Sequence, residues 1–119
     1  MQYVNLLGEL KNTANVATFA KDLFAALGIA DHETRESSNY VDGQYHIGRD
    51  GNMSITISMS DEEGNDDRPY WIHIVLDIPQ SENPINIVDR IIYEKALPAG
   101  FQVARINNFG KRGEQRIDY

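Results

Sequence analysis

Three histidines are the side chains in this sequence best suited to acid–base or metal chemistry. His32, His46 and His73 lie far apart in the chain, and none has a second ligand at the spacing of a metal motif. His73 and Asp77 share the parity of one strand face, but four residues along a strand cover about 13 Å. With Glu36 or Asp77, His46 and His73 would form an acid–base pair if a sheet brought them together. A small hydrolase using His46 and His73 is therefore an alternative function; otherwise the sequence indicates no catalytic residue, no cofactor and no metal.

Carboxylates are concentrated in one short segment between two predicted strands. Five of them occupy it: Asp61, Glu62, Glu63, Asp66 and Asp67. Acids in a calcium loop alternate and end in a bidentate glutamate, a spacing that this segment lacks. The next strand opens with Tyr70 and Trp71. Charge that could steer a basic partner therefore lies next to aromatic side chains that could anchor it. Solubility, and protection of the neighbouring strands from aggregation, would explain the same charge.

The C-terminal segment carries the opposite charge. Its turn, Gly110-Lys111-Arg112-Gly113, offers backbone amides and two cations to an anion, but it lacks the pattern of a phosphate-binding loop. A basic surface turn is the simpler interpretation. The segment from Arg105 to Tyr119 remains an alternative binding surface.

Composition narrows the class of protein. The chain has 119 residues, enough for a single domain (1–119) with one core. Its formal net charge of -7 argues against nucleic acid or an anionic membrane as the main ligand, because both would repel it. The absence of cysteine excludes disulfides and thiol catalysis. The first residues lack a signal-peptide pattern, and no run of apolar residues is long enough to span a membrane, so we expect a cytoplasmic protein.

Helical periodicity is clearest after Asn12 and Thr13, either of which can cap a helix. The expected buried stripe consists of Val16, Phe19, Ala20, Leu23, Phe24 and Leu27. Gly28 follows it, as a left-handed C-terminal cap would. Residues 1–11 repeat apolar side chains at helical spacing, which predicts a short first helix, although Gly8 weakens it and a strand remains possible.

Alternation predicts strands over residues 35–40, 43–48, 53–59 and 70–78. In the third of these strands one face carries Met53, Ile55, Ile57 and Met59, and the other face carries serine and threonine. A three-residue loop, 49–51, is the expected hairpin turn, because it would align Ile47 with Met53 and Tyr45 with Ile55. In the fourth, Trp71 and His73 fall opposite the apolar row that includes Tyr70.

A second helix is predicted from Asn83-Pro84, an N-cap followed by proline at the first position, to Leu97, with Pro98 ending it. A strand over 101–106 and a terminal segment, 116–119, follow. This order indicates an α+β domain. We expect a mostly antiparallel sheet of about five or six strands, with an N-terminal helix or helix pair and a later helix on one face.

Part of the sequence resembles a known family. The segment from Glu36 to Tyr45, ESSNYVDGQY, is followed by an alternating strand, the acidic segment and the aromatic-led strand YWIHI. This arrangement resembles small bacterial immunity proteins of polymorphic toxin systems, particularly the CdiI type of contact-dependent growth inhibition. The resemblance covers about a third of the chain. It implies a cytoplasmic, non-enzymatic antitoxin that blocks the active site or substrate groove of a cognate toxin domain, frequently a nuclease.

Charge supports the same expectation, because a nuclease presents a basic groove that carboxylates can occupy as phosphate mimics. The expected partner-binding residues are Asp61, Glu62, Glu63, Asp66, Asp67, Tyr70, Trp71 and His73. The expected partner is a basic toxin domain, with no direct contact to nucleic acid or membrane, and the protein itself is a monomer or a weak homodimer. A small acidic homo-oligomeric adaptor, paired through an edge strand, is the other alternative.

Overall fold

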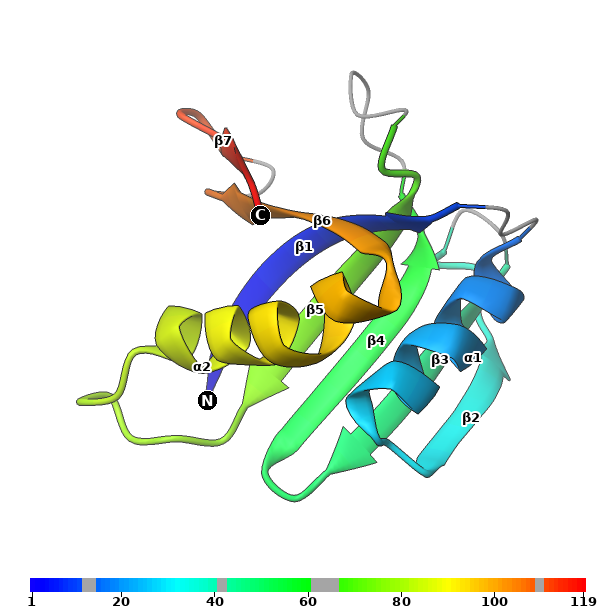
Figure 1. Cartoon of the computed structure of the whole chain (residues 1–119), viewed down its shortest axis with the longest axis horizontal. Coiled ribbons are helices and arrows are strands. Elements are labelled where there is room, and N and C mark those ends of the chain that lie inside the picture. Colours follow the sequence, from blue (N-terminus) through cyan, green and yellow to red (C-terminus); the bar gives the residue numbers. More distant parts are fainter. Residues whose placement is uncertain (12–14, 41–42, 61–66, 109–110) are drawn as a thin grey trace.

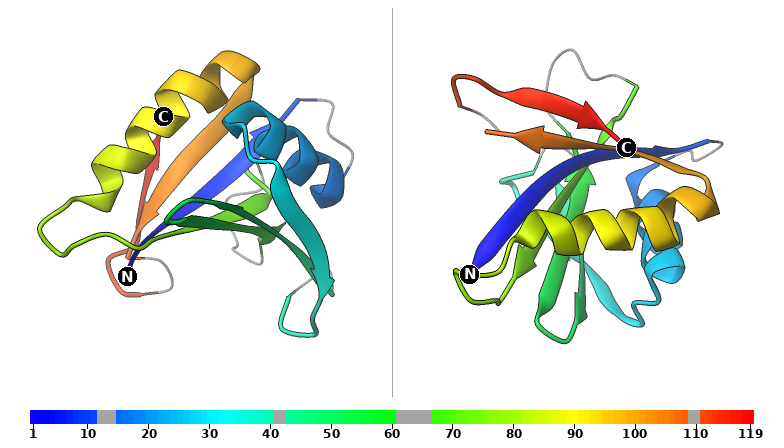
Figure 2. Two further views of the ribbon diagram at one scale, coloured as in Figure 1. Left: turned by 90° about the horizontal axis from the view of Figure 1, so that it is seen from below. Right: turned by 60° about the vertical axis from the view of Figure 1, so that its left-hand side comes forward.

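The computed structural model describes residues 1–11, 15–40, 43–60, 67–108 and 111–119. The elements follow in the order β1 (Gln2–Leu10), α1 (Val16–Leu27), β2 (Asp31–Glu36), β3 (Gln44–Asp50), β4 (Met53–Met59), β5 (Tyr70–Leu76), α2 (Pro84–Ile91), a π-helical turn (Ile92–Ala96), a 3-10 turn (Leu97–Ala99), β6 (Phe101–Asn107) and β7 (Gln115–Asp118). The strands form one antiparallel sheet in the order β2-β3-β4-β5-β1-β6-β7 (Figure 1). Both helices lie on the same side of it (Figure 2). The predicted α+β class is confirmed, with seven strands in the described residues.

The N-terminal segment is a strand, so of the two possibilities left open for residues 1–11 the strand is correct and the first helix does not form. β1 lies inside the sheet, where it pairs with β5 on one side and β6 on the other. Leu6 faces the helices and Leu7 faces away, and both are fully buried. Burial on both faces produced the apolar spacing that resembled a helix. Gly8 has a packing role, because a Cβ there would lie 2.9 Å from Ile72 Cδ1 and 3.0 Å from Phe19 Cζ.

Helix α1 packs over β3 and β4 with the predicted stripe. All six expected residues are buried, and Gly28 is the left-handed cap, with φ of 75°. The N-cap is Asn15, whose Oδ1 accepts a hydrogen bond from Thr18 N at 2.9 Å. The two caps predicted from sequence, Asn12 and Thr13, lie outside the described residues. The Phe19 ring stacks on Tyr70 at 4.4 Å between centroids, so the helix rests on the aromatic end of β5.

Helix α2 begins as predicted. Asn83 Oδ1 accepts a hydrogen bond from Ile85 N, and Pro84 occupies the first turn. Val88 and Ile92 are buried against the sheet. The helix then continues as the π-helical and 3-10 turns that end before Gly100.

The hairpin between β3 and β4 has a different register from the one predicted. Asp50 pairs with Met53, so the connection is the two-residue turn Gly51-Asn52, and Ile47 lies opposite Thr56. His46 and Gly48 therefore face the helices, whereas Ile47 faces away. A Cβ at residue 48 would lie 2.6 Å from Phe24 Cε1, so this strand must carry glycine where α1 packs closest. Apolar alternation alone missed this requirement, because it lies in the packing of a distant helix.

We predict that Gly48→Ala lowers the free energy of unfolding by about 1–3 kcal/mol, because the added methyl group overlaps the Phe24 ring. Urea denaturation would measure the change. Phe24→Leu in the same chain makes room for the methyl group. The double variant should therefore lose less than the sum of the two single variants, and a strictly additive loss would contradict this packing.

Candidate functional site

The sheet face opposite the helices carries the candidate site. Alternate residues of β5, Trp71, His73 and Val75, lie on this face and are half-buried, whereas their neighbours on the other face are fully buried. The residues opposite them on β4, Ser58, Thr56 and Ser54, are small and polar. Neither helix covers this face (Figures 1 and 2).

A continuous row of rings crosses this face, and we call it the aromatic row. It consists of Tyr45, Tyr40, Trp71, His73 and Tyr3. The centroid distances along it are 4.7 Å, 6.4 Å, 5.2 Å and 5.5 Å. The members come from β3, the β2–β3 connection, β5 and β1. Ser58, which pairs with Trp71, is 1% exposed, and its small size suits close approach of the rings over β4.

Asn5 fixes the centre of the row. Its Oδ1 accepts a hydrogen bond from Trp71 Nε1 at 3.3 Å and lies 2.7 Å from His73 Nδ1. Asn5 is 9% exposed, so its packing in the sheet fixes its orientation. Its hydrogen bonds in turn fix the orientation of both rings. An oxygen acceptor at Asn5 requires the proton of neutral His73 to sit on Nδ1, which leaves Nε2 as a hydrogen-bond acceptor.

Burial lowers the pKa of His73 below its ordinary value, because the charged imidazolium is partly removed from water. Near neutral pH the ring is therefore uncharged, and the aromatic row carries no positive charge of its own.

A cluster of ion pairs lies at the β6–β7 end of this face, and we call it the latch. It consists of Asp67, Arg68, Arg116 and Asp118. Arg116 on β7 donates to both carboxylate oxygens of Asp67, at 2.9 Å and 2.8 Å, and to Asp118 Oδ1 at 2.7 Å. Arg68, with a side chain only 13% exposed, donates to Asp67 and to Gln102 on β6. The latch ties the end of the acidic segment to β6 and β7.

The latch sets the charge that Asp67 presents. Its hydrogen bonds from Arg116 lower the pKa of the carboxyl to about 2, so it is ionised at neutral pH. The carboxylate is 57% exposed, and salt therefore screens the pair. Because Arg116 and Arg68 both contact it, Asp67 adds less to the field seen by a partner than a lone carboxylate would.

The structure describes four of the eight predicted partner-binding residues and places them in three different environments. Trp71 and His73 lie together in the aromatic row, and Asp67 lies in the latch. Tyr70 is only 6% exposed and packs against Phe19 on the opposite face, so it cannot join Trp71 in contacting a partner. Asp61, Glu62, Glu63 and Asp66 lie outside the described residues.

Several site residues were not predicted. They are Tyr3, Asn5, Tyr40, Tyr45 and Arg116. The strand parity of β5 gave the correct face for Trp71 and His73. It could not reveal which side chains from other elements share that face.

The acid–base pair of the hydrolase alternative does not form. His46 pairs across the sheet with Ile57 and through it with Ile72, so it faces the helices, opposite to His73. It is 4% exposed, and its Nδ1 lies 2.7 Å from Thr34 Oγ1. In the described part of the chain, no group of three or more His, Cys, Asp or Glu side chains could hold a metal ion.

Comparison with protein-family models, with curated proteins and with solved structures gives no match to this chain. Within the described residues, neither helix has the length and apolar character needed to cross a bilayer.

His73 provides a test of the aromatic row. Since its folded pKa lies below the unfolded value of about 6.5, protonation favours the unfolded chain. Its contribution to stability is present above about pH 6.5 and is lost as the pH falls through the folded pKa. We expect the free energy of unfolding of the wild type to fall more between about pH 7 and 5 than that of His73→Gln. Urea denaturation at each pH measures both, and parallel profiles would contradict the burial of this ring.

Proposed function

We propose that this protein is an immunity protein that binds and neutralises a basic toxin domain of the nuclease type through the sheet face bearing the aromatic row. The observation that carries the proposal is the aromatic row itself, five rings in contact on a face that neither helix covers. Large apolar rings on an open face are the groups that contribute most to protein–protein binding.

The rings are held in place before a partner arrives. Trp71 and His73 are fixed by Asn5, and Tyr40 is stacked on Tyr45. Preorganised side chains lose little conformational entropy on binding, so more of the contact energy appears as affinity. Tyr3 is 58% exposed and has the most surface still to bury.

Charge supports a basic partner. The chain has 18 acidic and 11 basic residues, and four acidic residues lie in positions 61–66, directly before the latch that leads into β5. Such an excess speeds encounter with a positively charged groove and repels nucleic acid. The aromatic row would supply contact that survives at high salt, because apolar burial is not screened.

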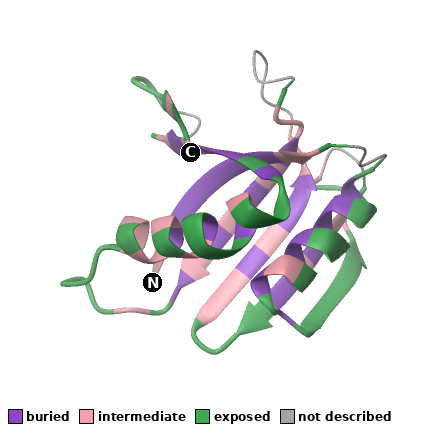
Figure 3. Ribbon diagram, viewed as in Figure 1, coloured by how far each residue is buried: buried purple, intermediate pink, exposed green. Residues whose placement is uncertain are grey.

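Edge-to-edge assembly is the basis of the adaptor alternative, and β2, one of the two edge strands, opposes it. Every residue of β2 is exposed (Figure 3). Four of its six residues are charged: Asp31, Glu33, Arg35 and Glu36. Charges along an edge strand discourage pairing with another sheet.

The direct experiment uses the products of the genes flanking this one, in particular any C-terminal toxin domain. Each domain is expressed with and without this protein, and bacterial growth and binding are measured. We expect one toxic domain to be neutralised in a stoichiometric complex. If none of the flanking products binds, the assignment as an immunity protein fails.

Binding kinetics locate the surface. Tyr3→Ala should weaken binding of the neutralised toxin domain, and Trp71→Ala should speed its dissociation by about 30-fold, the equivalent of roughly 2 kcal/mol. The matched control is Tyr93→Ala, because Tyr93 is also 58% exposed but lies on the helical side. Equal effects of Tyr3→Ala and Tyr93→Ala in surface plasmon resonance would remove the aromatic row from the interface.

The acidic segment has its own kinetic signature. Reversing Glu62 and Glu63 to lysine should slow association about tenfold at low salt, with little change in dissociation. Reversal of the exposed Glu82 and Glu94 changes the net charge equally and serves as the control. Asp67 is less suitable, since its reversal would also break the latch to Arg116. Identical association rates in the two double variants would mean that net charge alone, and not the segment, steers the encounter.

A further inference from the structure

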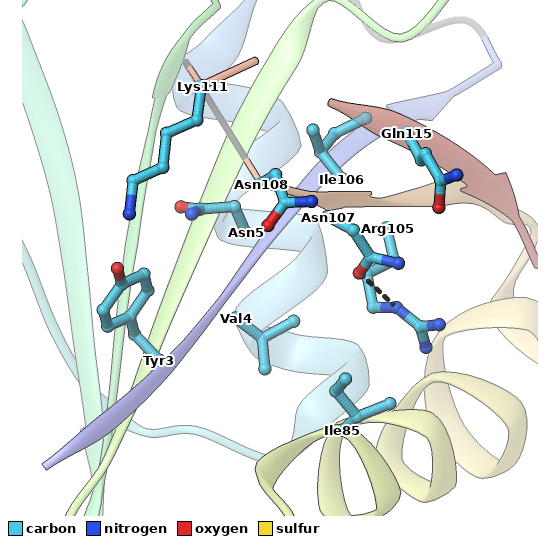
Figure 4. Close-up of a pocket in the computed structure, with 10 residues that line it drawn as sticks. All are labelled: Tyr3, Val4, Asn5, Ile85, Arg105, Ile106, Asn107, Asn108, Lys111 and Gln115. Atoms are coloured by element: carbon cyan, nitrogen blue, oxygen red, sulfur yellow. Dashed lines mark hydrogen bonds between the residues drawn. The ribbon is translucent and has the colours of Figure 1, made fainter. Parts of the chain in front are cut away.

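A cavity of about 460 Å³ lies where β1 and β6 separate (Figure 4). Pairing between these strands begins at Asn5 and Ile106 and runs toward Leu10. β6 ends at Asn107, and Asn108 takes the left-handed conformation, with φ of 56°. The chain therefore leaves the sheet at this point, and the first residues of β1 have no neighbour from β6 beside them.

The lining is polar and contains no carboxylate, although the chain has 18 acidic residues. Side-chain amides come from Asn5, Asn107, Asn108 and Gln115, and cations from Arg105 and Lys111. Val4, Ile85 and Ile106 supply the apolar part, and Tyr3 the aromatic part. The charge of the lining is thus positive although the chain as a whole is negative. An anion would meet only attractive charge in the lining.

The two cations differ in what they can still bind. Arg105 donates to Asp89 Oδ1 and Asn107 Oδ1, both at 3.2 Å, so its charge is already compensated. Tyr119 also donates to Asp89, which holds that carboxylate on the α2 side. Lys111 is exposed and has no ion-pair partner among the described residues. In Figure 4 its ammonium group extends toward the Tyr3 hydroxyl, across from the amides of Asn108 and Asn5.

We propose that this cavity binds a small organic anion that carries hydrogen-bonding groups along its length, with its phosphate or carboxylate at Lys111. Side-chain amides both donate and accept, so they match hydroxyl, amide or heterocyclic groups. The volume lies within the usual range of about 300–1,000 Å³ for ligand sites. The site is separate from the proposed toxin interface in function, although Tyr3 and Asn5 border both.

The test is a titration of the ¹⁵N-labelled protein followed by NMR. The probes are inorganic phosphate, adenosine monophosphate and citrate, with glucose as the neutral control, each to about 10 mM, where a ligand with Kd of about 1 mM is mostly bound. We expect one of the two organic anions to shift the amide signals of Tyr3, Asn107 and Lys111 more than phosphate does. Adenosine monophosphate and citrate distinguish a phosphate from a carboxylate ligand.

Matched variants assign the binding to the cavity. Lys111→Glu should weaken the binding at least tenfold, whereas Lys95→Glu, which changes the net charge equally on an exposed helical turn, should leave it unchanged. Gln115→Glu should weaken binding because it places a negative charge in the lining, whereas Gln80→Glu adds the same charge at an exposed position away from the cavity. The variants are surface substitutions, and their circular dichroism spectra should match the wild type.

Three results of the titration would overturn the proposal. They are shifts from no probe, shifts confined to other parts of the chain, and glucose binding as tightly as the anions. Equal weakening by Lys111→Glu and Lys95→Glu would also reject it, because it would indicate a general charge effect. None of these results bears on toxin binding, which is measured with a protein partner.

Discussion

The arrangement of this protein depends on β1 being buried on both faces and paired on both edges. It separates two packing environments, since Leu6 contacts the helix-covered core and Leu7 lies on the other face between Trp71 and Ala104. Gly8 lets the strand pass beneath Phe19. Asn5 is the buried polar residue of this strand, and its carboxamide holds Trp71 and His73. The helical side and the aromatic row are therefore positioned by alternate residues of one segment.

Because both helices lie on one side of the sheet, no helix shields the apolar side chains of the other face from water. The uncovered face is not left fully wet: the rings of the aromatic row shield its centre, and Arg68 and Arg116 lie over the β6–β7 end. The side chains of both arginines are largely removed from water, and their charged heads bind Asp67. An open sheet face can thus be stable in water and still present aromatic surface to a partner.

Local signals in the sequence were sufficient for parts of the fold and insufficient for others. The stripe of α1, the Asn83-Pro84 start of α2 and the exact bounds of β4 follow from short-range patterns and were predicted. For β1 the sequence left helix and strand both open, because burial on both faces imitates a helical period. The β3 register depended on the room that Phe24 needs at Gly48, a contact between distant elements. For the same reason the aromatic row was predicted only at Trp71 and His73, since Tyr3, Tyr40 and Tyr45 reach it from three other segments.

The position of β1 also determines how the chain can fold. β1 precedes the other strands in the chain, but its partners lie far along the sequence: Asn5 and His73 are 68 positions apart. Strands β2 to β5 are neighbours in the sheet in the order of the sequence, so they can pair as hairpins before β1 pairs with β5. Pairing over such long separations slows folding, because loop-closure entropy is lost before the contacts are gained. We therefore expect the core of the β2–β5 sheet to stay incomplete until β1 pairs with β5, and this late pairing leaves apolar surface open to misassembly.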